Sequence, residues 1–194
     1  MQILAKFLLL YLSAVFITSC SDDTSASGDD TSASGDDTSD SSSETPQITI
    51  RLNAFKDFSC TNNWTNRDGG LGLVANSSEG TCKTTFSGVD GKYKIVFRAQ
   101  TEFDGTPKYK ISVNGVTTAS GKYPYSTGVL TCDCFGNLNK WRTNCPDVIV
   151  DLTGGTVDLV NGDVIQVWGK EVWHCGTHGA YAKWKGVNLV PVSE

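Results

Sequence analysis

From Gln47 onward, apolar and polar residues alternate along the chain with a period of two. In residues 91–103 (GKYKIVFRAQTEF), one set of alternate positions is aromatic or aliphatic and the other is charged or polar. This pattern is typical of a strand with one face in a core and the other in solvent. Residues 107–115 (PKYKISVNG) repeat it and end in Asn114-Gly115, a pair that favours a tight hairpin turn. Both segments are predicted to be half-buried antiparallel strands.

The same alternation predicts further strands along the rest of the chain. No stretch carries a helical stripe of apolar residues, and the 20 glycines fall mostly in short turns between the alternating segments. The pattern therefore predicts an all-β fold, a jelly-roll β-sandwich, without a substantial helix. The additional strands are expected within residues 47–55, 70–76, 82–88, 147–152, 156–160, 163–169 and 182–192.

The N-terminus has a different pattern. Lys6 precedes an apolar run, Phe7 to Ile17, of about eleven residues, roughly half of what a membrane-spanning helix needs. It is predicted to be a removable signal peptide. The run ends Ile17-Thr18-Ser19-Cys20, which resembles the bacterial lipobox, and this resemblance implies that Cys20 is acylated and anchors the protein in a lipid bilayer. The alternative is that Cys20 is an ordinary thiol or half of a disulfide.

An acidic repeat follows Cys20. The heptad DDTSASG occurs twice from Asp22 and contains no apolar residue larger than alanine, so it is predicted to be a disordered, solvated linker. The predicted organisation is a signal peptide (1–19), the lipidated cysteine with its linker (20–45) and one β-sandwich domain (46–194). The Ser-Asp-Asp after Cys20 resembles export tags of bacterial surface lipoproteins, which implies an outer-membrane location facing the cell surface.

Charge and cysteine content narrow the function further. The whole chain has a formal charge of −5, but the acidic excess lies in the linker, and the domain has 13 acidic and 15 basic side chains. This balance gives no reason to expect a nucleic-acid partner. Six cysteines in an exported domain predict three disulfides, with Cys60–Cys82 preferred and Cys175 paired with one of the other three. The six are Cys60, Cys82, Cys132, Cys134, Cys145 and Cys175.

Three parts of the domain resemble the group of carbohydrate-binding modules formed by families 6, 35 and 36. They are the first strand (ITIRLNAFKDF), the central hairpin (residues 86–115) and the closing strands (GDVIQVWG and AYAKWKGVNLVPV). The resemblance spans nearly the whole domain. It implies a jelly-roll domain that binds polysaccharide or oligosaccharide and is not an enzyme.

The candidate sugar-binding residues are aromatic and polar side chains expected in loops. Tryptophan and tyrosine rings stack on sugar rings, while amide, carboxylate and guanidinium groups hydrogen-bond the hydroxyls. Core packing is the alternative role for each loop tryptophan, and it is the preferred role for Trp168 and Trp184, which fall within predicted strands. The candidates are Trp64, Trp141, Trp173, Tyr125, Asn63, Arg142, His174, His178 and Glu102.

Two groups of residues have a composition and spacing that a metal ion can use. Glu102 and Asp104 are expected at the exposed end of a strand, where they suit a calcium ion or sugar hydroxyls, with a solvated turn as the alternative. Calcium is accordingly the one cofactor that the sequence suggests. His174, Cys175 and His178 have a spacing that zinc can use, with Cys132 and Cys134 completing the set, but disulfide formation is favoured.

Two other functions remain open. Exposed aromatic residues in disulfide-linked loops also suit a non-catalytic adhesin or protein-interaction lipoprotein. Tyr181 and Lys183 in YAKWKG resemble the Tyr-x-Lys strand of jelly-roll polysaccharide lyases, although the other lyase motifs are missing. A glycosidase would need Glu102, Asp104 or Glu171 as paired carboxyls. The preferred prediction is a membrane-anchored lipoprotein that binds a glycan.

Overall fold

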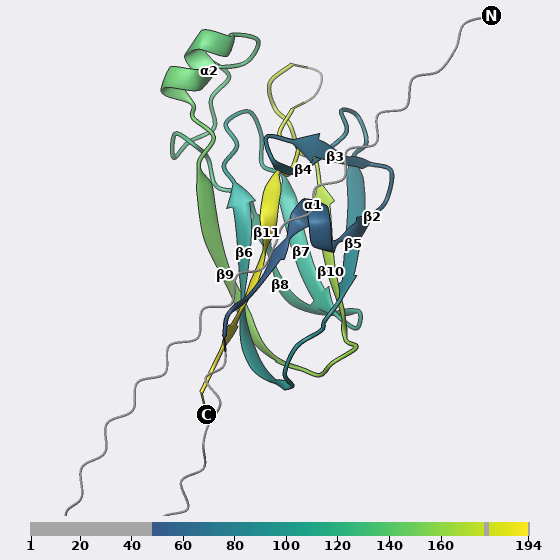
Figure 1. Cartoon of the computed structure of the whole chain (residues 1–194). Helices are drawn as coiled ribbons and strands as arrows, with labels where there is room; N and C mark the ends of the chain where they lie inside the picture. Colours follow the sequence, from purple (N-terminus) through teal and green to yellow (C-terminus); the bar gives the residue numbers. More distant parts are fainter. Residues whose placement is uncertain (1–47, 177–178, 194) are drawn as a thin grey trace, which may run out of the picture. The chain divides into compact units, whose positions relative to one another are not determined.

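Two antiparallel sheets form the domain in the computed structural model, which describes residues 48–176 and 179–193. One sheet runs β3 (Trp64–Arg67), β4 (Gly70–Leu73), β11 (Trp184–Pro191), β6 (Gly91–Gln100), β9 (Ile149–Leu159), with β1 (Ile50–Asn53) also paired to β11. The other runs β2 (Ser59–Cys60), β5 (Glu79–Thr85), β10 (Val164–Lys170), β7 (Lys108–Val113), β8 (Val116–Lys122) (Figure 1). The predicted jelly-roll β-sandwich with disulfide-linked loops is confirmed.

The core lies between the sheets and is built by the alternation seen in the sequence. Along β6, Tyr93, Ile95 and Phe97 are buried, whereas Lys92 and Lys94 are exposed. Trp184 on β11 is fully buried, and its ring centroid lies 5.7 Å from that of Phe97 and 5.1 Å from that of Phe58. Truncating such an aromatic side chain to alanine typically costs about 3–5 kcal/mol, so this cluster is a principal source of stability.

Residues 147–160, expected to form two strands, form a single one. The glycines Gly154 and Gly155 lie in the middle of β9 and do not end it. A Cβ at Gly155 would lie 2.9 Å from the Thr118 carbonyl oxygen, and one at Gly154 would lie 2.7 Å from Ala119 Cβ. These glycines therefore allow β8 to approach β9 closely. The sequence pattern suggested a turn there because a Gly-Gly pair also favours turns.

The predicted hairpin turn is present, and the strand after it was missed. Asn114 and Gly115 have φ values of 49° and 84°, the left-handed conformation that a two-residue hairpin turn needs. The chain then returns as β8, whose residues are mostly exposed or half-buried and lack a clear apolar alternation. Because β8 is an edge strand, few of its side chains need to be apolar.

Two short helices that the hydrophobic pattern did not indicate are present among the described residues, and neither is substantial. Helix α1 spans Ala54–Asp57 and α2 spans Leu138–Asn144. The Asn137 side chain caps α2 by accepting a hydrogen bond from the Lys140 N–H at 3.1 Å, and none of the residues in α2 is buried. This helix is held by its cap and by a disulfide, and not by an apolar stripe packed on the core. The hydrophobic pattern therefore gave no sign of it. No helix among the described residues is long and apolar enough to cross a membrane.

All six domain cysteines form disulfides. Cys60 pairs with Cys82 and Cys175 with Cys132, as the sequence favoured, and Cys134 pairs with Cys145 across α2. The zinc alternative is therefore wrong with respect to its cysteine ligands, whose sulfur atoms are bonded to one another. The signal peptide (1–19), the lipidation site Cys20, the linker (20–45) and His178 lie outside the described residues.

Candidate functional site

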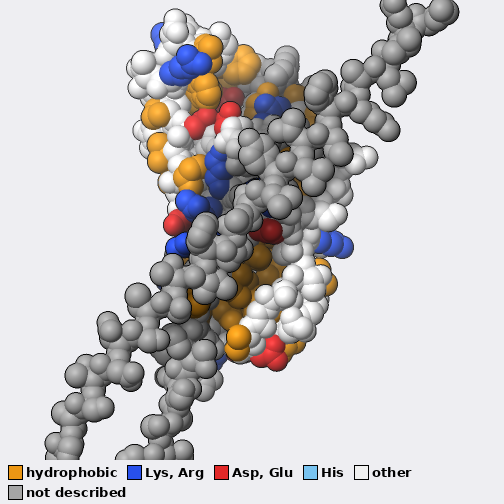
Figure 2. Space-filling model, in the orientation of Figure 1, with side chains coloured by type: hydrophobic (Ala, Val, Ile, Leu, Met, Phe, Trp, Pro, Cys, Tyr) orange, Lys and Arg blue, Asp and Glu red, His pale blue; other side chains and the backbone are white. Residues whose placement is uncertain are grey.

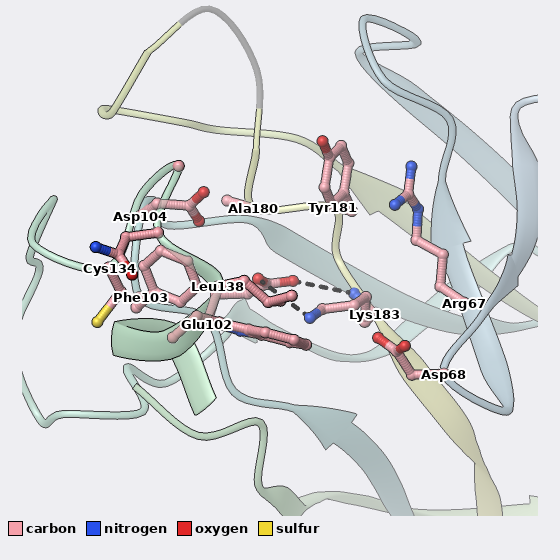
Figure 3. Close-up of a pocket in the computed structure, with 13 residues that line it drawn as sticks. Arg67, Asp68, Glu102, Phe103, Asp104, Cys134, Leu138, Ala180, Tyr181 and Lys183 are labelled. Carbon is pink, nitrogen blue, oxygen red and sulfur yellow. Dashed lines mark hydrogen bonds and ion pairs between the residues drawn. The ribbon is translucent and has the colours of Figure 1, made fainter. Parts of the chain in front are cut away.

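Four chain segments surround a pocket of about 440 Å³ at one end of the sandwich. Residues 67–68 lie at the end of β3, residues 102–104 follow β6, residues 134–141 run into the first turn of α2, and residues 180–183 precede β11. Figure 3 shows side chains from these segments, which flank strands of a single sheet and include the start of α2, lying around the pocket. Figure 2 shows acidic, basic and hydrophobic side chains side by side at the end of the molecule that carries α2.

A buried lysine with two carboxyl neighbours forms the floor of the pocket. Lys183 Nζ lies 2.9 Å from Asp147 Oδ1. It also lies 3.9 Å from Glu102 Oε2, and the Lys183 backbone N–H donates to Glu102 Oε1 at 3.5 Å (Figure 3). Burial on its own would lower the pKa of the Lys183 ammonium, but Glu102 and Asp147 outweigh it and raise that pKa above its ordinary value. Lys183 is therefore held in its charged form.

Glu102 is nearly inaccessible, with 2% of its surface exposed, and burial raises its pKa to about 8. The neighbouring Lys183 ammonium opposes this shift, whereas Asp104 and Asp147 add to it. Burial therefore favours the protonated form of Glu102 up to a higher pH than for an exposed glutamate. A protonated carboxyl can both donate and accept a hydrogen bond.

Asp104 brings an unpaired acceptor to the same pocket. It is 5% exposed, and its Oδ1 atom accepts no hydrogen bond from any described residue. Its other oxygen lies against Gly179, where a Cβ would overlap it, so a glycine makes room for the carboxyl group. Burial raises the pKa of Asp104. An acceptor left unpaired in this way costs about 1–3 kcal/mol, which a ligand hydroxyl or N–H would recover.

Tyr181 and Arg67 form one wall. The guanidinium carbon of Arg67 lies 3.8 Å from the Tyr181 ring centroid, and Arg67 Nε donates to the Leu73 carbonyl at 3.2 Å. These contacts hold the Arg67 guanidinium against an aromatic face (Figure 3). The wall thus combines a flat apolar surface with hydrogen-bond donors.

The backbone on each side of Tyr181 is strained. Ala180 and Ala182 have φ values of 50° and 53°, a conformation that costs a residue other than glycine about 1 kcal/mol or more. Two hydrogen bonds of 2.8 Å compensate: the Leu73 N–H donates to the Tyr181 carbonyl, and the Tyr123 hydroxyl donates to the Ala182 carbonyl. These two hydrogen bonds hold the strained backbone in the conformation that directs Tyr181 and Lys183 toward the pocket.

The α2 segment forms another wall of the pocket. Asn137, Leu138 and Trp141 line the pocket, and the Cys134–Cys145 disulfide closes the loop that carries them. Because α2 has no buried residue, its apolar side chains are available at the rim of the pocket. Trp141 provides an aromatic surface suited to stacking on a sugar ring.

Of the nine predicted sugar-binding residues, the structure places Trp141 and Glu102 in the pocket lining. The prediction that Trp64 lies in a loop is wrong: it is in β3, is 8% exposed, and packs 6.1 Å from the Trp184 ring. Its ring is enclosed by neighbouring strands, because a Cβ at Gly80 or Gly169 would overlap it. Trp64 is a core residue without a face for a ligand.

The remaining candidates among the described residues do not line the pocket. Asn63 uses its side-chain amide to donate to the Glu79 carbonyl at 2.6 Å, which ties two loops together. Arg142 is exposed on α2, and His174 is exposed with its Nε2 atom 3.4 Å from the Thr106 hydroxyl. Tyr125 and Trp173 are half-buried and join the 102–105 segment through single backbone bridges.

Two predicted environments are also corrected. Glu102 and Asp104, expected at an exposed strand end, are both buried because the α2 loop and residues 179–183 close over them. Among the described residues no group of three or more His, Cys, Asp or Glu side chains is arranged to hold a metal ion. Trp184 is in the core as predicted, but Trp168 lies half-buried on the outer face of its sheet.

The sequence did not point to Arg67, Tyr181 and Lys183 as pocket residues. The only signal was the Tyr-x-Lys spacing of residues 181–183, which resembles a lyase strand. Nothing in the local pattern of Arg67 distinguishes it from an exposed turn residue.

The chain is similar to known proteins in its fold and not in its sequence. No family model and no curated sequence matches the chain. The solved structures that are similar to it include the CBM36-1 domain of a multidomain xylanase from the hindgut metagenome of Trinervitermes trinervoides (10% identity, TM-score 0.49), the C-terminal CBM6 of a marine laminarinase from Zobellia galactanivorans (14%, 0.44) and a CBM35 from Paenibacillus barcinonensis (15%, 0.42). The matches cover 74–76% of this chain and 99–100% of those domains. None of these values assigns a ligand or an activity to this chain.

Proposed function

We propose that the pocket binds a polysaccharide or oligosaccharide. The observation that carries this proposal is the combination, in one pocket, of aromatic surfaces with a buried carboxylate oxygen that no described residue satisfies. Trp141 offers a face to the C–H groups of a sugar ring, the Tyr181–Arg67 wall adds apolar surface and N–H donors, and Asp104 accepts a hydrogen bond from a hydroxyl. The volume of about 440 Å³ lies within the range of about 300–1,000 Å³ common for small-molecule sites.

The protonation states support binding more than catalysis. The pKa of Lys183 is raised and its Nζ lies 2.9 Å from Asp147 Oδ1, so it is a poor base. The pKa of Tyr181 is raised by burial, which also disfavours the deprotonated form that a lyase base requires. The same groups suit hydrogen bonding, since Glu102 in its protonated form donates and Arg67 carries several N–H groups.

The proposal is tested by measuring glycan binding of the protein and two variants of α2. A glycan array and pull-downs on insoluble polysaccharides identify a ligand, and calorimetry then measures its affinity. Trp141→Ala is expected to weaken binding about tenfold or more, the loss typical of a central aromatic contact. Arg142→Ala, next to it but outside the pocket lining, is the matched control and is expected to bind as the wild type does.

Two outcomes would contradict the proposal. If the protein binds no glycan but captures a protein partner through the same residues, it is an adhesin or interaction protein. If it releases products from a panel of polysaccharides, it is an enzyme. Loss of affinity in Arg142→Ala equal to that in Trp141→Ala would place the site on the outer surface of α2.

We also propose that the domain is held at the outer membrane by acylation of Cys20, as the lipobox resemblance implies. Two or three acyl chains bind a bilayer firmly, since each buried methylene contributes about 0.8 kcal/mol. Mass spectrometry of the purified protein is expected to show a lipidated N-terminal Cys20, and Cys20→Ser is expected to release the protein from the membrane fraction. Membrane association that persists in Cys20→Ser would rule the lipid anchor out.

A further inference from the structure

Four lysines gather on the outer face of the five-stranded sheet, in adjacent rows. The strand register places Lys170 of β10 opposite Lys108 of β7, and Lys108 opposite Lys122 of β8. Two residues along, Lys110 lies opposite Trp168. Because opposite residues in antiparallel strands point to the same side, these five side chains share one surface, here called the lysine face.

This arrangement is unfavourable for the domain on its own. Adjacent strands lie about 4.8 Å apart, and like charges directly opposite one another destabilise a sheet by roughly 0.2–1 kcal/mol per pair. All four lysines are exposed, and none makes an ion pair within 4.0 Å with a described residue. Glu79, opposite Lys170, is the one acidic residue in either of these two rows. The repulsion would be relieved by an anionic ligand.

An aromatic ring lies within the same cluster. Trp168 is half-buried, and Lys110 Nζ lies 5.4 Å from its ring centroid. Its other cross-strand neighbour is Thr81, and Ser120 lies opposite Lys110. Across four strands this row therefore presents a hydroxyl, an aromatic ring, an ammonium and a second hydroxyl, in that order. These groups can bind a charged sugar.

We propose that the lysine face is a second binding site, for an anionic polysaccharide that carries sulfate or carboxylate groups. Lys108, Lys122 and Lys170 neutralise the anions, Lys110 contributes a fourth positive charge, and Trp168 stacks on a sugar ring between them. Single-stranded nucleic acid is less well matched, because its binding sites usually stack successive bases on several aromatic side chains and this face has one.

Binding to dextran sulfate and to unmodified dextran tests this site, since the two polymers share a backbone and differ in sulfate. The protein is expected to bind dextran sulfate and not dextran, and more weakly as NaCl rises from about 50 mM to about 500 mM, because salt screens exposed charges. The double variant Lys108→Gln/Lys170→Gln is expected to bind at least tenfold more weakly, and Trp168→Ala several-fold more weakly.

A matched control removes two charges elsewhere. Lys92 and Lys94 are exposed on β6 of the other sheet, so Lys92→Gln/Lys94→Gln changes the net charge equally and is expected to bind as the wild type does. An equal loss in both double variants would show that net charge alone is responsible and would overturn the proposal. A second pair of results would also overturn it: Trp168→Ala binds dextran sulfate as the wild type does, and the wild type binds polyuridylate as tightly as dextran sulfate. The lysine face would then be a general polyanion surface.

This site and the pocket can fail separately. Trp141→Ala is expected to leave dextran sulfate binding unchanged, because Trp141 lies in the pocket lining and not on this sheet face. Neutral-glycan binding in the pocket with no response to dextran sulfate would refute the lysine face alone. Normal dextran sulfate binding without any neutral ligand would support the lysine face and count against the pocket.

Discussion

Replacing Glu102 by glutamine tests whether a protonated carboxyl is buried under the pocket. The pKa of Glu102 is about 8 in the folded protein, against an ordinary value of 4.5, with burial as the main cause. Between these values the folded state keeps a proton that the unfolded state releases. The free energy of unfolding is therefore greatest below pH 4.5 and falls as pH rises to about 8, by up to about 5 kcal/mol from this group.

Glu102→Gln keeps the shape and hydrogen bonding of the protonated side chain but does not ionise. We expect wild type and variant to have similar stability near pH 5, and the variant to be the more stable protein near pH 9. Burial also raises the pKa of Glu171, to about 7, so a smaller decrease with pH should persist in the variant.

Urea denaturation at pH 5, 7 and 9, with the disulfides intact, measures these differences. Glu79→Gln, at an exposed position, is the control for loss of one surface carboxyl and is expected to keep the wild-type pH dependence. Equal pH dependence in wild type and Glu102→Gln would refute the reasoning, because Glu102 would then be ionised in the folded protein.

Three further substitutions test the parts that shape the pocket. Cys134→Ser/Cys145→Ser is expected to make residues 134–145 much more sensitive to limited proteolysis, because α2 has no buried residue; an unchanged cleavage rate would show that other contacts hold it. Tyr123→Phe is expected to lower the free energy of unfolding by about 1–2 kcal/mol in chemical denaturation, since it removes the 2.8 Å hydrogen bond to a buried carbonyl, and no change would mean that this bond contributes little. Gly179→Ala is expected to weaken glycan binding in calorimetry, because a Cβ there overlaps the Asp104 carboxylate, whereas wild-type affinity would exclude Asp104 from the site.

The strands could be predicted from the sequence because their information is local. The alternation in β6 and the Asn114-Gly115 turn each depend on a few adjacent residues, and both are present in the structure. The Gly154-Gly155 pair misled the prediction because glycine permits a close approach of strands as well as a turn. Helix α2 was missed because its side chains face solvent.

The pocket could be predicted only in part because its residues come from distant segments. Glu102 and Asp104 look like an exposed acidic turn in sequence, and they become buried when residues from 134 to 183 close over them. Trp141 was identified from its polar loop, but the same reasoning selected Trp64, which β3 places in the core. Sequence alone does not say which loops meet.

The most direct test of sugar binding in the pocket is a ¹⁵N–¹H NMR titration of the protein with the oligosaccharide that binds best on the array. We expect the largest chemical-shift changes at the backbone amides of Asp104, Asn137, Trp141, Tyr181 and Lys183, and little change across β5, β7 and β10. Shift changes confined to the outer faces of the sheets, with none at these pocket residues, would contradict the account.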